Sequence, residues 1–324
     1  MSESVLITGS SGYIGSHFAK YFVKCGWRVL GLDRVLPPAR VTKYLSANLH
    51  ADISEEERVR EFCTKENVTS VVHCAARALV GESMTDPEGY HDNNVVRGKK
   101  LADALQKCGV KAFLFSSTAA VYGEPIHTPI REDHPKKPIN PYGASKFEFE
   151  NDLLQRKGLA VGIFRYFNAA GADPENELGE VHDPETHLIP NAIRAGLGLI
   201  PAFELFGTDY KTRDGTCERD FIHVWDLAVA HELLLRTLLS TGGARIFNLG
   251  TSHGFTVKEV LDEVDAQLGH PVERRLLPRR EGDPMVLIAD PRKAMEELPW
   301  KPQHSDLRNI IRTAIDWHKQ CTRS

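Results

Sequence analysis

The chain has 324 residues, 41% hydrophobic content and a formal net charge of -4, so it is long enough to bury a sizeable core in one large domain or two smaller ones. A slightly acidic chain with mostly scattered basic residues argues against nucleic acid as a partner. No apolar run approaches the roughly 18 residues of a membrane span, and the first residues carry no basic leader, so we expect a cytoplasmic protein without membrane contact. Its six cysteines are widely spread and are expected to be free thiols.

Short β-branched segments alternate with longer segments of helical character as far as about residue 168. The strands expected from this pattern are 5–8, 29–32, 68–73 and 112–116. Such alternation predicts an α/β fold with a parallel, doubly wound sheet. From about Ala169, glycine and proline interrupt the periodicity, which is typical of loops that carry specificity. A strand end and helix at 221–239 and a buried strand at 246–249 predict that the chain then revisits the first domain.

We therefore expect two domains, the second of them smaller and of mixed α/β type. Their expected extents are 1–168 plus about 219–250 for the first, and about 169–218 plus 251–324 for the second. Two helices are expected to open with a capping box, in which a hydroxyl side chain and a glutamate three residues later satisfy free backbone N–H groups. These boxes are Ser54 with Glu57, and Thr256 with Glu259.

A glycine motif follows the first apolar run. Gly9, Gly12 and Gly15 come after residues 5–7 and lead into a helix-compatible segment at 14–23. Glycine at such places allows a tight turn and lets a pyrophosphate approach a helix N-terminus. The spacing is G-x-x-G-x-x-G, and a glycine triplet also occurs in ordinary turns. The context of strand, turn and helix favours a Rossmann-type dinucleotide site.

Acidic residues follow the next two apolar segments. Asp33 ends the second segment, where an acid meets the ribose hydroxyls of adenosine, so the sequence favours NAD over NADP. Arg34 beside it is the type of residue that accepts a 2'-phosphate. Asp52 and Ile53 follow the third segment and are placed to meet an adenine edge, although a helix-capping role explains this region nearly as well.

Tyr142 and Lys146 stand four residues apart in a helix-compatible stretch, so both side chains project from one face. A phenol needs its pKa lowered by about 3 units to act as a base at neutral pH, and a neighbouring ammonium favours that shift. Thr118, just past the strand at 112–116, is placed to bridge the phenol and a reacting alcohol. With a nicotinamide cofactor, these residues predict hydride transfer coupled to proton removal. Taken singly, they also fit a solvated helix start and a strand end.

These motifs resemble the extended short-chain dehydrogenase/reductase family, and the likeness runs almost end to end. The matching segments are 8–17, 73–76, 80–83, 92–95, 116–123, 142–146, 165–168, 219–224 and 278–283. The last two, with Asn168, point to the nucleotide-sugar 4-epimerases within that family. The resemblance implies oxidation of a UDP-sugar at C4, rotation of the 4-keto sugar and re-reduction, with UDP-glucose and UDP-galactose as the expected pair.

The resemblance also implies roles for individual residues. The chemistry is expected from Tyr142, Lys146 and Thr118. The residues implied at the NAD site are Gly9, Gly12, Tyr13, Ile14, Gly15, Asp33, Asp52, Ile53, Ala75, Ala76, Asn93, Ser116, Tyr142, Lys146 and Tyr166. Those implied at the UDP-sugar are Thr118, Tyr142, Asn168, His187, Leu188, Phe206, Arg219, Arg280 and Asp283, with a capping or core role open for His187. No metal ligand set is expected among the histidines.

The family pairs through helices that match 95–105 and 147–154, so a homodimer is expected, although packing within one subunit explains the same apolar residues.

Some positions depart from the family pattern. Ala78 replaces a lysine near the pyrophosphate, which predicts weaker cofactor retention, and Leu287 stands where other members screen the sugar. Leu287 therefore leaves UDP-xylose/UDP-arabinose and UDP-GlcNAc/UDP-GalNAc open as alternative substrates.

Two other functions are less expected. A sugar-nucleotide dehydratase or decarboxylase needs an extra acid beside Thr118, and the methyl groups of Ala119 and Ala120 cannot transfer protons. A non-catalytic NAD-sensing protein on the same fold is disfavoured because the three catalytic residues are all intact.

Overall fold

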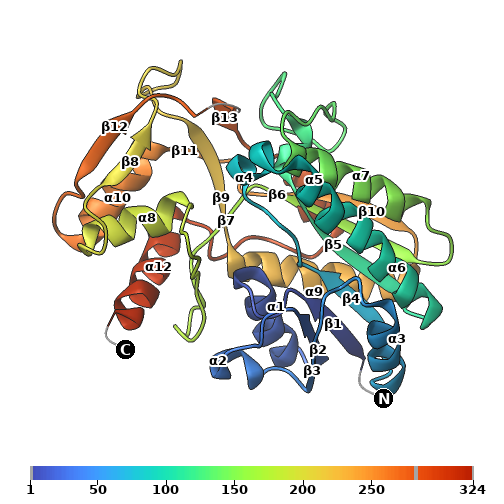
Figure 1. Ribbon diagram of the computed structural model, residues 1–324. Coiled ribbons are helices and arrows are strands. Elements are labelled where there is room, and N and C mark those ends of the chain that lie inside the picture. Colours follow the sequence, from blue (N-terminus) through green and yellow to red (C-terminus); the bar gives the residue numbers. More distant parts are fainter. Residues whose placement is uncertain (1–2, 281–283, 323–324) are drawn as a thin grey trace.

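A parallel seven-stranded sheet lies at the centre of the larger part of the molecule (Figure 1). The computed structural model describes residues 3–280 and 284–322. The strands follow the order β10-β6-β5-β4-β1-β2-β3. Their bounds are β1 (Ser4–Thr8), β2 (Arg28–Asp33), β3 (Ala47–His50), β4 (Ser70–His73), β5 (Ala112–Thr118), β6 (Ala160–Tyr166) and β10 (Ala244–Leu249). All neighbouring pairs are parallel, which confirms the predicted α/β fold.

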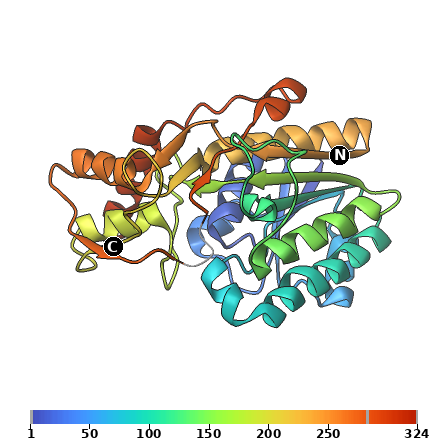
Figure 2. The same ribbon diagram turned by 90° about the horizontal axis from the view of Figure 1, so that it is seen from above.

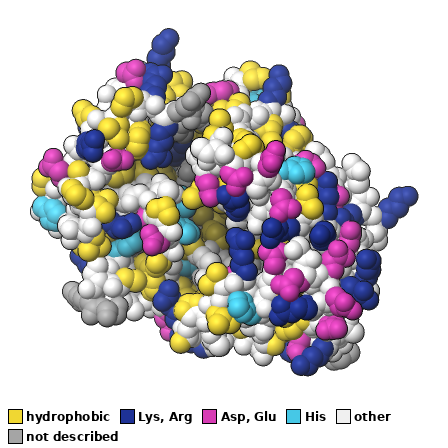
Figure 3. Space-filling model, in the orientation of Figure 1, with side chains coloured by type: hydrophobic (Ala, Val, Ile, Leu, Met, Phe, Trp, Pro, Cys, Tyr) yellow, Lys and Arg dark blue, Asp and Glu magenta, His cyan; other side chains and the backbone are white. Residues whose placement is uncertain are grey.

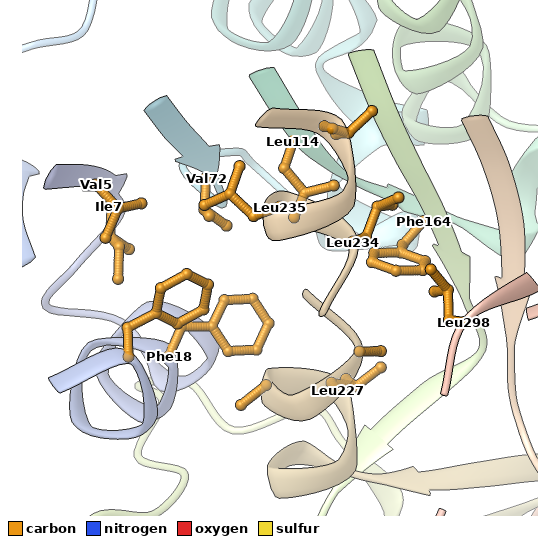
Figure 4. Close-up of a cluster of buried hydrophobic side chains, with 14 of the residues drawn as sticks. Val5, Ile7, Phe18, Val72, Leu114, Phe164, Leu227, Leu234, Leu235 and Leu298 are labelled. Carbon is orange, nitrogen blue, oxygen red and sulfur yellow. The ribbon is translucent and has the colours of Figure 1, made fainter. Parts of the chain in front are cut away.

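Helices cover both faces of this sheet because side chains alternate between the faces along each strand. The helices are α1 (Tyr13–Lys24) and α9 (Val224–Thr241) on one face, and α3 (Glu56–Lys65), α6 (Arg97–Lys107) and α7 (Pro141–Gln155) on the other. Val5 and Ile7 of β1 pack with Phe18 of α1 and with α9 (Figure 4). Leu6 projects to the opposite face and joins Phe149 of α7. The view from above shows α9 in orange on one side, and α6 in teal and α7 in green on the other (Figure 2).

A smaller mixed α/β part lies beside the large sheet (Figure 1). Its strands are β7 (Asn168–Ala170), β9 (Glu218–His223), β11 (Gly254–Thr256) and β13 (Val286–Leu287) in one sheet, and β8 (Phe203–Phe206) with β12 (Arg274–Leu277) in another. Its helices are α8 (Leu188–Gly196), α10 (Val257–Leu268) and α12 (Leu307–Cys321). Ile193, Leu261 and Ile311 from these three helices share one apolar cluster, so the smaller part has a core of its own.

Short helices complete the architecture. They are α2 (Ala39–Thr42), α4 (Val80–Thr85), α5 (Pro87–His91), η1 (Asp92–Val96), η2 (Ala119–Tyr122) and α11 (Arg292–Glu297). The expected strand end and helix at 221–239 correspond to β9 and α9, and the expected strand at 246–249 corresponds to β10. Among the described residues, no helix is both long and apolar enough to cross a bilayer.

One of the two expected capping boxes is present. Thr256 caps α10, and the side chain of Glu259 returns a hydrogen bond to the Thr256 backbone, as predicted. The box at Ser54 is wrong, because α3 has Glu55 as its N-cap. Asp52 Oδ1 accepts from both the backbone N–H (2.9 Å) and the hydroxyl (2.6 Å) of Ser54, so that hydroxyl is held in a turn before the helix.

Candidate active site

The catalytic candidates meet where β5 ends and α7 begins. Asn140 is the N-cap of α7, and its side-chain oxygen accepts a hydrogen bond of 2.8 Å from the backbone N–H of Gly143. Tyr142 lies in the first turn of this helix, and Lys146 lies one turn later. Thr118 is the last residue of β5, and its hydroxyl is hydrogen-bonded to the Tyr142 phenol. The fold therefore brings together the three residues that the sequence predicted to carry the chemistry.

Burial shifts the pKa values of both Tyr142 and Lys146. Burial raises the pKa of the Tyr142 phenol, and the hydrogen bond from Thr118 offsets only part of the rise. Burial also lowers the pKa of Lys146 to about 8. The Lys146 ammonium donates to the backbone carbonyl of Ser116 at 2.9 Å. The predicted depression of the phenol pKa is therefore wrong for the chain by itself, because loss of hydration outweighs the hydrogen bond from Thr118.

Ser116, Tyr166 and Cys74 form a polar layer next to Tyr142. The hydroxyls of Ser116 and Tyr166 are hydrogen-bonded, and Cys74 Sγ lies 3.4 Å from Ser116 Oγ. Burial raises the pKa of Tyr166 far above its usual value and that of Cys74 to about 12. Both groups stay protonated at neutral pH, so they can donate hydrogen bonds but do not compete with Tyr142 as a base.

The loop between β1 and α1 has the shape that a pyrophosphate needs. Gly9 has a φ of 69°, and a Cβ there would lie 2.9 Å from the backbone nitrogen of Ala75. A Cβ on Gly15 would lie 2.2 Å from the Gly9 carbonyl oxygen, so close packing of helix on strand requires this glycine. At Gly12, by contrast, a Cβ would meet only that carbonyl among the described atoms, at 3.4 Å. No described side chain caps α1 at Gly12, so its first N–H groups are available to an anion.

The other residues predicted around this loop lie close to it. Tyr13 and Ile14 form the first turn of α1, and the Tyr13 hydroxyl donates to the Gly171 carbonyl at 2.6 Å. That bond ties the glycine loop to the start of the smaller part. Ala75 follows β4, and its backbone N–H donates to the Thr8 hydroxyl at 3.3 Å, beside Gly9.

The acidic residues differ in how fully they are engaged. Asp33 ends β2 and accepts from the backbone N–H groups of Ser11 (2.9 Å) and Val35 (3.0 Å), one on each carboxylate oxygen. A carboxylate has about four acceptor sites, so it retains capacity for ribose hydroxyls. Asp52 uses one oxygen for Ser54 and the other for Arg97, at 2.8 Å. These bonds hold the turn before α3 and do not cap that helix, whose N-cap is Glu55, and Ile53 after Asp52 is buried.

Asparagines connect the loop after β4 to α7. Asn93, which was predicted, donates to Asn94 at 3.0 Å. Asn94, which sequence reasoning missed, bonds both backbone groups of Arg77 (2.9 and 3.0 Å) and the Ser145 hydroxyl (3.0 Å). The sequence signal that could have indicated Asn94 was its place beside Asn93 in the segment 92–95, which matches the family. Asn94 thereby fixes that loop against the helix that carries Tyr142 and Lys146.

The predicted substrate residues lie mainly along the small sheet. Asn168 begins β7 and donates to the Asp220 carbonyl at 2.8 Å. Arg219 lies in β9, and Leu287 of β13 pairs with it in parallel register. Leu287 packs against the cluster formed by Val121, Tyr122 and Ile130. The face of the molecule is hollowed between its two parts (Figure 3), so this sheet forms one side of a cleft.

One predicted substrate residue, Arg280, lines an open pocket of about 320 Å³. The Arg280 guanidinium lies 3.9 Å from the centre of the Phe206 ring, a cation–π contact. The pocket is lined by Glu124, Asp209, Tyr210, Lys211, Arg279, Arg280 and Met285. Asp283, which was also predicted, lies outside the described residues.

His187 and Leu188 lie at the entry of α8, His187 as its N-cap and Leu188 as its first residue. Among the described residues, no side-chain hydrogen bond caps this helix, so the His187 ring has another role. Its Nδ1 lies 2.5 Å from a carboxylate oxygen of Glu180, with His182 and Glu185 beside it. Sequence reasoning missed this cluster, although the spacing E-x-H-x-x-E-x-H at 180–187 was visible, because an irregular loop gives no periodicity that predicts which side chains converge.

Comparison with known proteins agrees with this geometry. The model of the NAD dependent epimerase/dehydratase family matches residues 5–250. The chain therefore belongs to that family, whose parallel sheet and glycine loop it carries.

Within the family, the chain is similar to UDP-glucose 4-epimerases. The enzyme of Rhizobium leguminosarum bv. trifolii is 44% identical over 98% of this chain and 97% of the relative. The structure of UDP-glucose 4-epimerase from Brucella ovis in complex with NAD has a TM-score of 0.93 at 41% identity, covering 97% of this chain and 98% of that one. The Stenotrophomonas maltophila UDP-glucose-4-epimerase, with bound NAD and formylated UDP-arabinopyranose, has a TM-score of 0.94 at 35% identity and 99% coverage of both chains.

Proposed function

We propose that the protein is an NAD-dependent UDP-sugar 4-epimerase that interconverts UDP-glucose and UDP-galactose. The observation that carries this proposal is the meeting of Thr118, Tyr142 and Lys146 at the end of β5. A glycine loop with the shape for a dinucleotide and the near full-length likeness to UDP-glucose 4-epimerases support it.

In the proposed reaction, the Tyr142 phenolate removes the proton from the 4-hydroxyl of the sugar, and Thr118 holds that hydroxyl beside the phenol. Bound NAD supplies the hydride acceptor and a positively charged ring. The Lys146 ammonium, one helical turn from Tyr142, favours the charged phenolate electrostatically. When the sugar turns before the reverse step, Tyr142 returns the proton to the opposite epimer, so the cycle leaves no net redox change.

We assign the cofactor to a larger domain made of residues 1–168 plus about 219–250. We assign the nucleotide sugar to a smaller domain made of residues 251–324 plus about 169–218. The packing of α9 and β10 on the large sheet supports the return of the chain to the first domain. Within 219–250, the residues of β9 pair instead with the small sheet. β9 thus forms the border between the two proposed domains.

The turning sugar requires a firmly held diphosphate and a loosely held hexose. We assign the diphosphate and uridine to Arg219, Arg280 and Asn168, because a guanidinium matches phosphate oxygens with two parallel hydrogen bonds. The stacking of Arg280 on Phe206 orients one such guanidinium at the pocket. His187 and Leu188 at the entry of α8 complete the proposed substrate side.

One observation favours a second substrate class. The Stenotrophomonas maltophila structure holds a formylated UDP-arabinopyranose, so a closely similar fold accepts a UDP-linked pentose. Leu287, beside Arg219, is the residue of this chain that we assign to screening the sugar. A UDP-xylose/UDP-arabinose activity is therefore the alternative to be tested beside the main one.

The test is incubation of the purified protein with UDP-glucose, UDP-GlcNAc and UDP-xylose in separate reactions, with the C4 epimers followed by NMR. We expect UDP-galactose from UDP-glucose as the fastest product. The matched control is Tyr142→Phe, which keeps the ring and loses the base, and which should lose about 10²-fold or more of the turnover while still binding UDP. Failure to form any C4 epimer, or near-normal turnover by Tyr142→Phe, would contradict the proposal.

We also propose that the protein is a cytoplasmic homodimer. The helices η1 and α7 carry the exposed apolar residues Val96 and Leu154, which supports pairing of this face with a second copy. Among the described residues, no disulfide bond joins any of the cysteines, which supports a reducing compartment.

A further inference from the structure

The loop before α8 holds two buried carboxylates opposed by two histidines. The side chains of Glu180 and Glu185 are only 6% and 2% exposed, whereas those of His182 and His187 are 40% and 52% exposed. Both imidazoles turn Nδ1 toward the carboxylates. The four donor atoms, two nitrogens and two oxygens, all lie within 4.8 Å of one another. The cluster does not include Tyr142, Lys146 or Thr118, and it shares one residue, His187, with the proposed substrate side.

The distances among these donors fit a four-coordinate ion. Zinc bonds to histidine nitrogen and carboxylate oxygen at about 2.0–2.2 Å, which places neighbouring ligand atoms of a tetrahedron about 3.4 Å apart. His182 Nδ1 lies 3.1 Å from Glu180 Oε1 and 3.7 Å from Glu185 Oε2, and His187 Nδ1 lies 3.5 Å from the other oxygen of Glu185, Oε1. The contact of His187 with Glu180, at 2.5 Å, must open to admit the ion, and Glu185 must turn one oxygen toward both histidines.

Other hydrogen bonds hold the ligands in place. Glu185 Oε1 accepts the backbone N–H groups of Thr186 (2.8 Å) and His187 (2.9 Å). The backbone carbonyls of Glu180 and Glu185 accept from Trp317 (3.1 Å) and Asn191 (3.1 Å), which anchor the loop to α12 and α8. Outer contacts of this kind orient ligands and raise the affinity of metal sites.

We propose that Glu180, His182, Glu185 and His187 form a binding site for a divalent transition metal, with Zn²⁺ as the best match. A set of two imidazole nitrogens and two carboxylate oxygens suits a borderline ion more than the all-oxygen ligands that Mg²⁺ and Ca²⁺ prefer. The spacing of i, i+2, i+5 and i+7 places all four ligands on one short loop. A bound ion would fix this loop at the entry of α8, where the smaller part begins its helical core.

The experiment is calorimetric titration of the full-length, chelator-washed protein with Zn²⁺, together with Co²⁺ as an optical probe. We expect one Zn²⁺ per chain and a Co²⁺ absorption spectrum without a thiolate charge-transfer band. The variant His182→Ala removes an exposed ligand, so it should fold normally and bind Zn²⁺ at least about tenfold more weakly. Glu185→Gln keeps the shape of the side chain and should weaken binding similarly.

The matched control is His270→Ala, which removes an exposed histidine outside the cluster and should leave the affinity unchanged. Circular dichroism and thermal unfolding verify that each variant is folded. The proposal is overturned if wild-type protein takes up no Zn²⁺, if His182→Ala binds it as tightly as the wild type, or if the Co²⁺ spectrum reports cysteine ligands. Any of these results would leave the four side chains as two ion pairs that neutralise the buried carboxylates.

Discussion

The Tyr142 phenol and the Lys146 ammonium are both buried, and burial shifts their pKa values in opposite directions. Removing a charge from water favours the neutral form, so the phenol holds its proton while the ammonium gives up its proton more readily. At neutral pH the chain alone therefore holds a protonated phenol beside a lysine that is still mostly charged. A cationic cofactor ring beside the phenol would reverse that preference for Tyr142, which couples its use as a base to an occupied cofactor site.

The pH dependence of turnover should carry the signature of Lys146. Its pKa of about 8 means that the ammonium predominates below pH 8 and is lost as the pH rises through that value. Because the phenolate needs the ammonium, we expect kcat to fall above about pH 8. The comparison variant is Lys146→Arg, whose guanidinium stays charged across this range, so its residual activity should not show the alkaline decrease. A wild-type kcat that rises steadily to pH 10 would contradict the assignment.

The identity of the cofactor depends on Asp33. Its carboxylate ends β2 with both oxygens oriented by backbone N–H groups, and its charge would repel a 2'-phosphate. Denaturation of the purified protein should therefore release NAD, as measured by mass spectrometry. Arg34→Ala serves as a control, because the Arg34 side chain is exposed and its loss should leave the cofactor unchanged. Recovery of NADP would overturn this role for Asp33.

Among the elements, α7 is the one on which the site depends most. Its Glu150 forms a buried ion pair with Arg165 of β6 at 2.6 Å and accepts from Ser117 of β5 at 2.5 Å. Asn94 holds the same helix through Ser145. A buried pair of this kind makes the position of a helix specific, since separating the charges leaves each without compensation. The helix is thus fixed on several sides before its first turn presents Tyr142.

The N-cap of α7 should affect both stability and turnover. Asn140→Ala removes the acceptor for Gly143, which we expect to cost about 1 kcal/mol in the free energy of unfolding. Fraying of the first turn should also displace Tyr142 and lower kcat. Asp306→Ala removes the equivalent bond at α12, where Asp306 accepts from Asn309 at 2.9 Å, and should cost stability without lowering kcat. Urea unfolding and steady-state kinetics measure both quantities, and equal kcat values for the two variants would refute the link.

At the scale of the molecule, the two parts are held together by contacts that converge on the loop after β7. The Tyr13 hydroxyl bonds to Gly171, and the Lys20 ammonium of α1 pairs with the buried Asp173 at 2.5 Å. These contacts join the glycine helix to the smaller part. In the proposed reaction, the two parts together must hold a diphosphate firmly and leave room for the sugar to turn.

A charged substitution on the face formed by η1, α6 and α7 tests the proposed dimer. Val96 is 37% exposed there, and Val96→Glu should convert the dimer into monomers because an unpaired charge cannot be buried between two copies. The comparison variant is Leu199→Glu, which alters a 47% exposed residue just beyond α8 and should leave the dimer intact. Light scattering should give twice the 36.2 kDa of one chain for the wild type. A wild-type mass of one chain would exclude the dimer.

The sequence by itself determined the features that depend on neighbours along the chain. Alternation of apolar strands with helices predicted the large sheet, and the glycine motif predicted the tight turn at Gly9. The capping box at Thr256 was predictable because both of its partners lie within one helical turn. The spacing of Tyr142 and Lys146 likewise placed them on one face of a helix.

Only the tertiary structure decided the features that depend on burial or on segments far apart in sequence. Pairing of β9 with β7, β11 and β13 placed Leu287 beside Arg219, which no local pattern indicates. The pKa of Tyr142 depends on how much water the fold removes around it, so spacing alone predicted the wrong direction. The convergence of Glu180, His182, Glu185 and His187 depends on the path of an irregular loop, which is fixed by its contacts with α8 and α12.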